Sequence, residues 1–420
     1  MNIGFDSAEI LLPNFNQIDG TRWSVVACDQ YTSEPAYWEA VAATVGDAPS
    51  TLSMILPEVY LSETEKRIPR INQSMQTLLD TLLVSHPGAM IALERTQSDG
   101  CVRLGLIGAV DLEQYDYRKG SDSLIRATEG TVLERIPPRV AVRRNAPLEL
   151  PHVMLLIDDP HHTVIEPTLT DCQGEEPLYD FDLMLGGGHV RAYALNPRQQ
   201  ANVKEGLASL ITPSALQECY GDPALAPLLF AVGDGNHSLA SAKAAYEEVK
   251  AAIGEEPAKT HPARYALVEV VNLHDAALQF EPIYRVVFHC DPADLLTSLK
   301  TSLSELHGTA PAQTFRYITA VEEGDVTVPH PTQQLTVGTL QRFLDDYLQS
   351  HPEVEVDYIH GEDSLRSLIT DGNTVGFLFD GMRKDELFRT VIYDGALPRK
   401  TFSMGHAPDK RYYLECRKIK

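Results

Sequence analysis

The sequence predicts an α+β protein with mixed sheets, and two observations indicate this class. Runs rich in branched apolar residues, typical of strands, occur at 90–96, 102–112 and 264–273, whereas apolar residues recur at helical spacing in 61–84. These segments do not alternate regularly between strand and helix, as a doubly wound sheet requires. With 420 residues, of which 43% are hydrophobic and 22% charged, the chain can form two or more lobes.

The elements of the first two thirds of the chain follow from local patterns. Residues 23–29 are predicted to form a buried strand that ends at Asp29, and Ser33 is a candidate N-cap for the helix after it. The segment 61–84 predicts a long amphipathic helix. The other predicted elements are antiparallel strand pairs at 90–96 with 102–112 and at 153–159 with 162–167, a helix over 203–220, and a strand over 264–273.

The sequence changes character near residue 290. Beyond it we predict helices at 294–306, 337–350 and 363–370 and a strand at 374–382. This pattern indicates a main α+β domain over 1–290 and a smaller C-terminal α/β lobe over 291–420. The last segment, 383–420, holds ten of the 35 Lys and Arg residues, so a basic tail able to fold back on the first lobe is expected.

Charge and composition exclude several classes of function. The formal net charge is -24, which disfavours binding to nucleic acid and to anionic membranes, because both require a basic surface. No apolar run approaches the roughly 18 residues of a membrane span, and the start of the sequence lacks the pattern of a signal peptide. We therefore expect a cytoplasmic protein, whose six scattered cysteines are reduced and mostly structural. The oligomeric state is left open.

The segment 228–250 carries the strongest functional signal. An apolar run ends at Val232, a turn with two glycines follows, and an Ala-rich stretch at helical spacing begins near Ser238, which predicts strand, tight turn and helix. Asp234, Asn236 or Ser238 could cap the helix. Its N-terminus would attract an anion, and His237 could exchange a proton there. The alternative is a capped helix after a buried strand, with His237 merely hydrogen-bonded.

Longer motifs carry a resemblance to a known family. The stretches WSVVACDQYTSEPAYW, SLIRATEGTVLERIPPR, DGNHSLASAKA, LPRKTFSMG and KRYYLECRKI resemble a large bacterial family of uncharacterised proteins whose turn reads D-G-H-H-R. The turn is more distantly similar to those of ParB-type domains, sulfiredoxin and free-serine kinases. This resemblance implies a ParB/sulfiredoxin-like strand–turn–helix core. Sulfiredoxin chemistry is not expected, because the cysteine it needs in the turn is replaced by Asn236.

Two departures from the family signature affect phosphate binding. Asn236 and Ser238 stand where the signature has His and Arg, and an arginine there would clamp phosphate with two donors. The proposed replacements are Arg126 and Arg135 from the middle motif. Arg399 and Lys400, from the C-terminal stretch, are further candidates. Gly235, Asn236 and Ser238 are expected to contribute the turn's own contacts. The alternative for the middle motif is an exposed helix held by salt bridges.

The catalytic residues are assigned from charge and from the resemblance. Asp29 and Glu129 are candidate bases for an acceptor hydroxyl, because each matches an acidic position of the family, and Asp29 ends a predicted buried strand. Asp234 and His237 complete the predicted catalytic set. Asp234 is also the candidate Mg²⁺ ligand, since that ion prefers carboxylates beside phosphates. A second acidic cluster, at 158–162, is more typical of a plain turn than of a cation site.

Together these features predict phosphoryl transfer. The expected substrate is a small hydroxylated metabolite, with free serine or phosphoserine favoured by the kinase resemblance, and the direction, kinase or phosphatase, is open. The implied cofactor is ATP or ADP with Mg²⁺, and the implied partner is a small anionic metabolite or nucleotide. A non-catalytic regulator that binds nucleotide or metabolite is the alternative, favoured by the changes at Asn236 and Ser238. A DNA-partition factor is disfavoured by the acidic charge.

Overall fold

A computed structural model of the protein describes residues 2–130 and 136–420. The chain divides into two compact units. Among the described residues, unit 1 comprises 2–127, 136–278 and 405–420, and unit 2 comprises 128–130 and 279–404. The sequence places the boundary at 290, whereas the chain enters unit 2 at Gln279 and returns to unit 1 at Gly405. The last sixteen residues thus belong with the first lobe.

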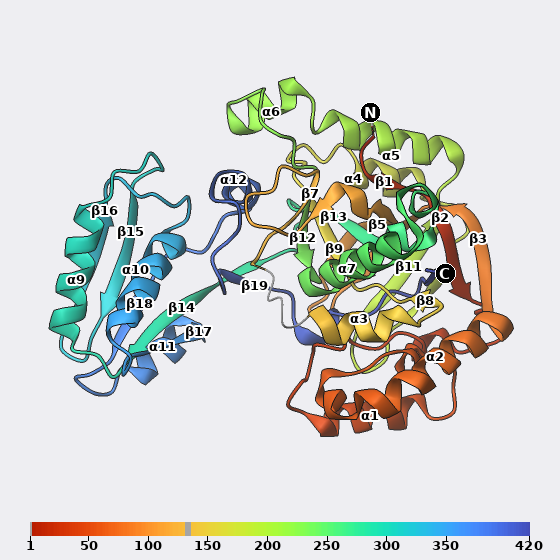
Figure 1. Cartoon of the computed structure of the whole chain (residues 1–420), viewed down its shortest axis with the longest axis horizontal. Coiled ribbons are helices and arrows are strands. Elements are labelled where there is room, and N and C mark those ends of the chain that lie inside the picture. Colours follow the sequence, from red (N-terminus) through yellow and green to blue (C-terminus); the bar gives the residue numbers. More distant parts are fainter. Residues whose placement is uncertain (1, 131–135) are drawn as a thin grey trace. The chain divides into compact units, whose positions relative to one another are not determined.

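A large mixed sheet forms the centre of unit 1 (Figure 1). Its hydrogen-bonded order is β10-β11-β4-β5-β13-β9-β12-β7-β6, and β1 pairs with β5. The pairs β4–β5 and β5–β13 are antiparallel, whereas β13–β9 and β12–β7 are parallel, which confirms the predicted α+β class. The strands are β1 (Phe5–Asp6), β4 (Ile91–Thr96), β5 (Val102–Asp111), β6 (Tyr115–Asp116), β7 (Ile125–Ala127), β9 (Met154–Ile157), β10 (Tyr179–Asp182), β11 (His189–Ala194), β12 (Phe230–Asp234) and β13 (Tyr265–Asn272).

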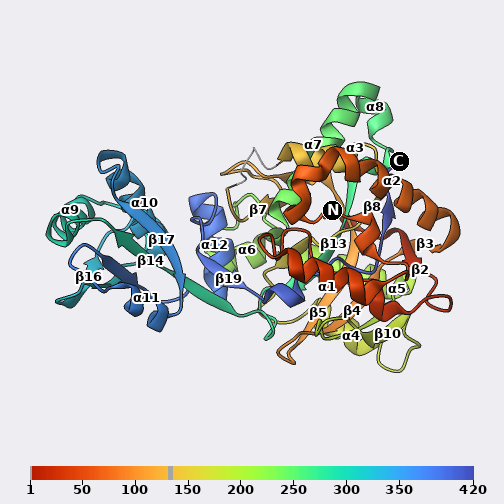
Figure 2. The same cartoon turned by 90° about the horizontal axis from the view of Figure 1, so that it is seen from below.

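Two small ladders and a set of helices complete unit 1. β2 (Ala8–Pro13) pairs with β3 (Leu83–Ala89), and β8 (Leu148–Glu149) pairs with β20 (Arg417–Lys418). Helix α3 packs beside α7, as Figures 1 and 2 show. The helices are α1 (Pro35–Val45), α2 (Thr64–Thr81), α3 (Ile136–Arg144), α4 (Ile165–Asp171), α5 (Pro197–Ser209), α6 (Pro213–Tyr220), α7 (Asn236–Ile253) and α8 (Glu255–Ala258).

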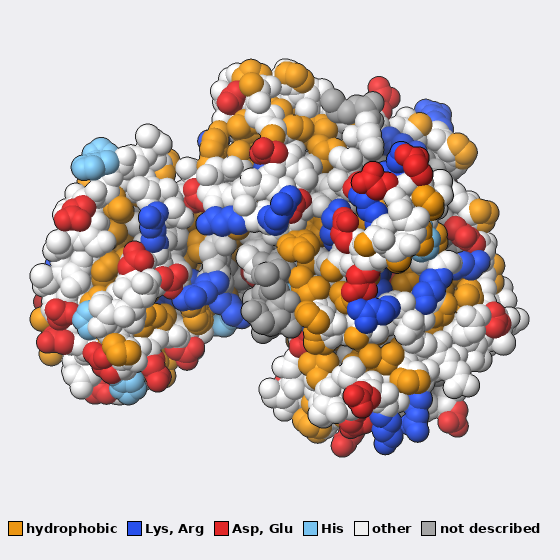
Figure 3. Space-filling view, in the orientation of Figure 1, with side chains coloured by type: hydrophobic (Ala, Val, Ile, Leu, Met, Phe, Trp, Pro, Cys, Tyr) orange, Lys and Arg blue, Asp and Glu red, His pale blue; other side chains and the backbone are white. Residues whose placement is uncertain are grey.

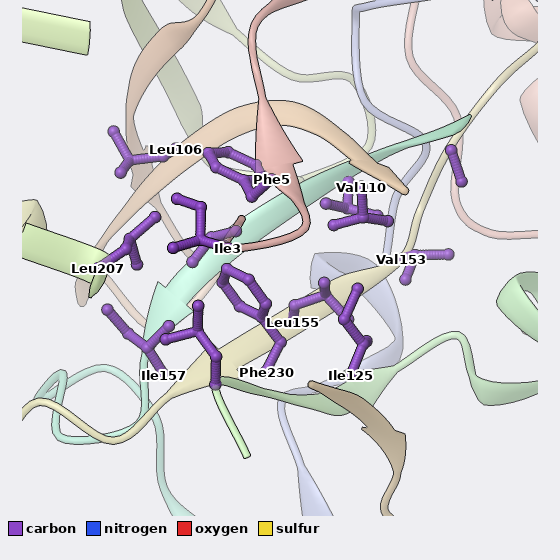
Figure 4. Close-up of a cluster of buried hydrophobic side chains, with 14 of the residues drawn as sticks. Ile3, Phe5, Leu106, Val110, Ile125, Val153, Leu155, Ile157, Leu207 and Phe230 are labelled. Carbon is purple, nitrogen blue, oxygen red and sulfur yellow. The ribbon is translucent and has the colours of Figure 1, made fainter. Parts of the chain in front are cut away.

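The main core of unit 1 lies between the sheet and its helices (Figure 4). Phe5 of β1 meets Phe230 of β12, with ring centroids 5.9 Å apart. Leu155 and Ile157 of β9 are fully buried in the same cluster, and Leu207 joins it from α5. Burial of this apolar surface holds β9 and β12 rigidly, so the chain that follows β12 starts from a fixed position.

Several local predictions are confirmed. The segments 90–96 and 102–112 form the antiparallel pair β4–β5, with Ile91 opposite Ile107. The predicted amphipathic helix is α2, and it buries Ile71 and Met75. The run 264–273 is β13.

Other local predictions are wrong. Residues 23–29 are largely buried but form no ladder, because they lie against the irregular C-terminal segment with a single bridge from Val26 to Arg411. Glu34, and not Ser33, occupies the N-cap position of helix α1, where its side chain makes no capping hydrogen bond, and Pro35 is the first residue of the helix. The run 162–167 leads into helix α4 instead of a strand, because the Asp159 carboxylate accepts the backbone N–H groups of the two residues before it.

The predicted helix over 203–220 is two helices, α5 and α6. The break lies at Thr212, whose hydroxyl accepts the Ala215 backbone N–H at 3.3 Å and so caps a new helix. Pro213 occupies the first position of α6, where its missing N–H costs nothing.

Unit 2 is built on its own antiparallel sheet, in the order β16-β15-β18-β14-β17, with β19 on β14. The predicted helices at 294–306, 337–350 and 363–370 correspond to α9, α10 and α11, and the predicted strand at 374–382 contains β18. The elements are β14 (Phe280–Phe288), α9 (Pro292–Ser304), β15 (Gln313–Ile318), β16 (Glu323–Val328), α10 (Thr336–Ser350), β17 (Glu355–His360), α11 (Glu362–Leu368), β18 (Val375–Leu378), α12 (Lys384–Asp394) and β19 (Phe402–Met404).

Acidic and basic side chains are interspersed on the face drawn in Figure 3. Within the described ranges, 2–130 and 136–420, no helix is long and apolar enough to cross a membrane.

Candidate functional site

The turn after β12 has the predicted strand–turn–helix form. β12 ends at Asp234 and α7 begins at Asn236, with Gly235 between them at φ 82°. A side chain at Gly235 would be strained by this φ and would lie 3.0 Å from the Val153 Cα. Gly235 is therefore the N-cap, and the predicted capping by Asp234, Asn236 or Ser238 is wrong. Asp234 instead accepts the Gly235 backbone N–H at 2.8 Å.

Ser238 pairs with a histidine that the sequence analysis did not select. The Ser238 Oγ lies 3.0 Å from the Nε2 of His152, which precedes β9. His152 is 9% exposed, and its Nδ1 is buried with no hydrogen-bond partner among the described residues. The Tyr412 ring meets the His152 ring edge-on, with centroids 5.0 Å apart. The two partners are 86 residues apart, and no local pattern links them.

Asp29 lies in the same neighbourhood and is ionised. Burial opposes its charge, but the basic side chains of His152, Lys410 and Arg139, with a 3.1 Å hydrogen bond from Gln30, hold the Asp29 pKa below its ordinary value. Asp29 therefore lies within electrostatic reach of His152 and Lys410, and its catalytic role stays a prediction.

Lys410 supplies a cation beside the turn. Its Nζ lies 3.5 Å from the Asp234 Oδ2, and its backbone carbonyl accepts the Ala27 N–H at 2.7 Å. Both side chains are partly exposed, so the attraction between them is screened by solvent. The returning C-terminal segment thus fixes Lys410 between the turn and the chain that carries Asp29. From the basic C-terminal segment, Arg399 and Lys400 were the predicted phosphate contacts, whereas Lys410 is the cation that lies beside the turn.

A cavity of about 390 Å³ opens beside the turn. Polar residues of the site, Cys28, His152 and Ser238, line it together with aliphatic side chains from several elements. Arg139, which pairs with Glu58, and Arg143, which pairs with Glu149, also line it. Its aliphatic lining comprises Met54, Ile55, Leu56, Leu61, Met75, Val142, Leu148, Leu150, Val153, Leu239 and Leu267.

Cys28 is not activated for nucleophilic chemistry. Burial, with the charge of the neighbouring Asp29, raises the pKa of its thiol to about 12. The thiolate is the reactive form, so this cysteine is inert near neutral pH.

One predicted phosphate contact, Arg126, has structural contacts of its own in unit 1, and three other predicted site residues belong to unit 2. Arg126 is buried, and its guanidinium donates to the backbone carbonyls of Ser123, Ala226 and Pro227. Glu129, Arg399 and Lys400 are exposed residues of unit 2, and Arg399 pairs there with Asp345 and with the Tyr358 hydroxyl. Arg135 falls outside the described residues.

His237 is partly buried in the first turn of α7, and its backbone carbonyl accepts the Ser241 hydroxyl at 2.7 Å. Asn236, Gly235 and Ser238 share that turn. The structure thus brings together Asp29, Asp234, Gly235, Asn236, His237 and Ser238 in unit 1, and adds His152 and Lys410.

No group of three or more His, Cys, Asp or Glu residues could hold a metal ion within the described residues. The acidic cluster at 158–162 forms structural contacts: Asp158 accepts from the Tyr220 hydroxyl at 2.6 Å and lies 2.7 Å from the His274 Nε2. The preferred interpretation of that cluster, a plain turn, agrees with these contacts.

Comparisons with solved structures find distant similarity. A free serine kinase variant in complex with AMP aligns with 74% of this chain and 91% of its own, at a TM-score of 0.36 and 10% identity. A variant in complex with ADP aligns over the same shares, at a TM-score of 0.35 and 9% identity. A conserved hypothetical protein from Pyrococcus furiosus covers 70% of this chain and 89% of its own, at a TM-score of 0.33 and 10% identity.

Among curated proteins, a 3-isopropylmalate dehydrogenase of Clavibacter michiganensis subsp. michiganensis (strain NCPPB 382) is 34% identical over 99 residues. The match covers 23% of this chain and only 27% of that protein. The family described as protein of unknown function, DUF1015, matches residues 13–347, and the chain, as its motifs predict, belongs to this family.

Proposed function

We propose that unit 1 is a phosphotransferase that moves a phosphoryl group between a nucleotide and a small hydroxylated metabolite. The observation that carries the proposal is the charge pattern around Asp29. A partly buried carboxylate with a lowered pKa lies beside the basic side chains of His152 and Lys410; His152 also contacts Ser238 of α7, and Lys410 contacts Asp234 at the end of β12. An acceptor hydroxyl and an anionic donor can therefore meet in one place, which is the main requirement of phosphoryl transfer.

The anion site is the start of α7. An 18-residue helix presents a partial positive charge at its N-terminus, where Gly235, Asn236 and Ser238 lie. Lys410 adds a full charge 3.5 Å from Asp234, and Arg139 lines the adjoining cavity. We assign to Lys410 the role of the arginine that the family signature has at position 238. Arg126, Arg135, Arg399 and Lys400 stay proposed phosphate contacts without support from this geometry.

Asp29 is the proposed base. Its lowered pKa makes it a weak proton acceptor, so its contribution is to orient the acceptor hydroxyl and take up its proton as transfer completes. This suits a loose transition state, in which positioning outweighs early deprotonation. Glu129, in unit 2, stays a proposed second base, and His237 a proposed proton donor.

The residues present fit a magnesium–nucleotide complex better than a metal held by protein alone. Mg²⁺ usually binds through one or two carboxylates together with substrate phosphates, and Asp234 offers its Oδ2 beside Lys410. In such a complex the ion would neutralise the phosphates, and Asp234 would hold it against the turn. We propose ATP or ADP as the nucleotide and Asp234 as the metal ligand.

Free serine or phosphoserine is the first substrate to test, because the turn resembles that of free-serine kinases. The test incubates the full chain with Mg²⁺, serine and ATP or ADP, and separately with phosphoserine. We expect product in one direction, and losses of at least roughly 100-fold for Asp29→Asn and Lys410→Met. Asp47→Asn, an exposed carboxylate after α1, should leave turnover unchanged. Unchanged turnover in both site variants would refute the assignment.

A second candidate, a non-catalytic regulator that binds nucleotide or metabolite, is favoured by Ser238 at the signature's arginine position. Thermal stabilisation by nucleotide, without product from any tested acceptor, would select it.

A further inference from the structure

Ser238 has the surroundings of a nucleophile. It lies in the first turn of α7, and its Oγ is 3.0 Å from the His152 Nε2, a distance at which imidazole can take the hydroxyl proton. Both residues line the 390 Å³ cavity, so the oxygen adjoins space for a reacting group.

His152 is built as a base rather than as a satisfied core residue. It is 9% exposed, and its Nδ1 has no partner among the described residues, although a buried polar atom without a hydrogen bond is costly. When Nε2 accepts from Ser238, Nδ1 carries the ring proton. The Asp29 carboxylate lies near enough to interact with this ring electrostatically.

Ser241 shows the contrast on the same helix. It also lines the cavity, one turn further on, but its hydroxyl donates to the His237 backbone carbonyl at 2.7 Å. Of these two serines, only Ser238 faces an imidazole.

We propose that Ser238 accepts the phosphoryl group first, and that transfer runs through a covalent phosphoserine at this position. The inference rests on the proposed phosphotransferase function and deepens it. The donor is a nucleoside di- or triphosphate, or a phosphomonoester in the reverse direction.

The steps balance in two halves. In the first, the Oγ–H proton passes to the His152 Nε2, the Oγ–P bond forms, and the bond from phosphorus to the leaving oxygen breaks. In the second, the Oγ–P bond breaks as the acceptor oxygen bonds to phosphorus, and Oγ recovers its proton from Nε2. The proton of the acceptor hydroxyl passes to Asp29 and on to solvent.

The test is to trap the intermediate. The full chain is incubated with Mg²⁺ and ATP or ADP in the absence of acceptor, and intact mass and peptide sequencing are used to find one added phosphoryl group. We expect the group on Ser238, and its transfer to free serine in a chase. Ser238→Ala should carry no label and lose at least roughly 100-fold in turnover, whereas Ser241→Ala should behave as the native chain. His152→Asn should slow labelling by roughly 100-fold or more without unfolding the protein.

The outcomes separate the two proposals. Serine phosphorylation without any label on Ser238, or with full turnover in Ser238→Ala, overturns the covalent step and leaves the phosphotransferase intact. Absence of both label and turnover, with every donor and acceptor tried, removes both. Label on Ser238 that is not passed to serine supports the covalent step and points to another acceptor.

Discussion

The residue with the clearest electrostatic assignment is Asp29. Its pKa lies below the ordinary value because the surrounding cations outweigh the cost of burial, so it is ionised at every pH above about 4. Any role that depends on the charge of Asp29 is therefore fully present near neutral pH. It is lost only when the pH falls below about 4 and the carboxylate becomes protonated.

We predict that turnover of the native chain shows no loss attributable to Asp29 between pH 8 and pH 5. Asp29→Asn should reduce kcat by at least roughly 100-fold. The ratio of native to variant kcat should stay constant between pH 8 and pH 5. The measurement is kcat against pH for both proteins. A variant whose deficit shrinks steadily toward pH 5 would mean that Asp29 is protonated there, contrary to this assignment.

Glu415 gives a prediction of the opposite sign. It is buried, it accepts a 2.7 Å hydrogen bond from the Tyr179 hydroxyl, and burial raises its pKa to about 7. The folded protein therefore binds more protons than the unfolded chain between pH 4.5 and about 7, so the free energy of unfolding falls as the pH rises through this window.

Glu415→Gln keeps the hydrogen-bond acceptor but cannot carry the charge. We predict that the free energy of unfolding of this variant, measured relative to that of the native chain, is higher at pH 8 than at pH 5. The relative gain should be about 2 to 3 kcal/mol, because most of the interval between the ordinary pKa of 4.5 and the raised value of about 7 lies within this pH range. Urea unfolding at the two pH values measures it. Equal differences at both pH values would contradict a raised pKa.

At the scale of elements, the first turn of α7 depends on the conformation of Gly235. Its φ of 82° turns the chain sharply from β12 into the helix, which places Ser238 against His152. Gly254 caps the other end of the same helix at φ 89°, with open space where a Cβ would stand. Both glycines have a positive φ, but ψ is 26° at Gly235, the left-handed helical region, and 164° at Gly254, a region that is essentially restricted to glycine.

We predict that Gly235→Ala lowers the free energy of unfolding by about 1 to 2 kcal/mol, the cost of the left-handed conformation for an L-residue, and that Gly254→Ala lowers it by at least as much. Only Gly235→Ala should also reduce turnover, because its Cβ lies 3.0 Å from the Val153 Cα and must displace the turn. Urea unfolding and steady-state kinetics test the pair. Equal kinetic losses in both variants would indicate that strain, and not the position of the turn, controls activity.

Across the whole molecule, what the sequence could predict follows the range of the interactions. The strand, turn and helix at 228–250 are set by neighbouring residues, so the pattern predicts them. The run at 162–167 looked like a strand because it is rich in branched residues, yet one carboxylate, Asp159, fixes it as the start of a helix. Residue propensities for strand or helix do not predict such a side-chain contact to the backbone.

The other residues of the site come from segments that are far apart in the sequence. His152 reaches Ser238 across 86 residues, and Lys410 arrives only after the whole of unit 2. Arg126 was a reasonable phosphate clamp by residue type, but its donors are used by backbone carbonyls. Sequence patterns give the chemistry of a side chain and not its partners, so the turn was predictable and the groups facing it were not.

The return of the C-terminal segment has a consequence for folding. The C-terminal segment is an integral part of unit 1. The Trp23 Nε1 donates to the Leu414 carbonyl at 3.1 Å, the Ser24 hydroxyl donates to the Tyr412 carbonyl at 2.6 Å, and β20 pairs with β8. The chain leaves and re-enters through β14 and β19, which are antiparallel neighbours with Pro282 opposite Phe402.

We predict that unit 1 folds without the bulk of unit 2 but not without residues 405–420. Joining Pro282 to Phe402 through Asn-Gly closes β14 and β19 as a hairpin, because that dipeptide fits a two-residue turn between paired strands. The shortened chain should unfold cooperatively in urea and keep near-UV circular dichroism from buried Trp23 and Trp38. A chain that stops at Met404 should lose both signals, since Trp23 and β8 then lack their partners. A folded truncated chain, or an unfolded hairpin-closed one, would show that the two units are not organised as their contacts indicate.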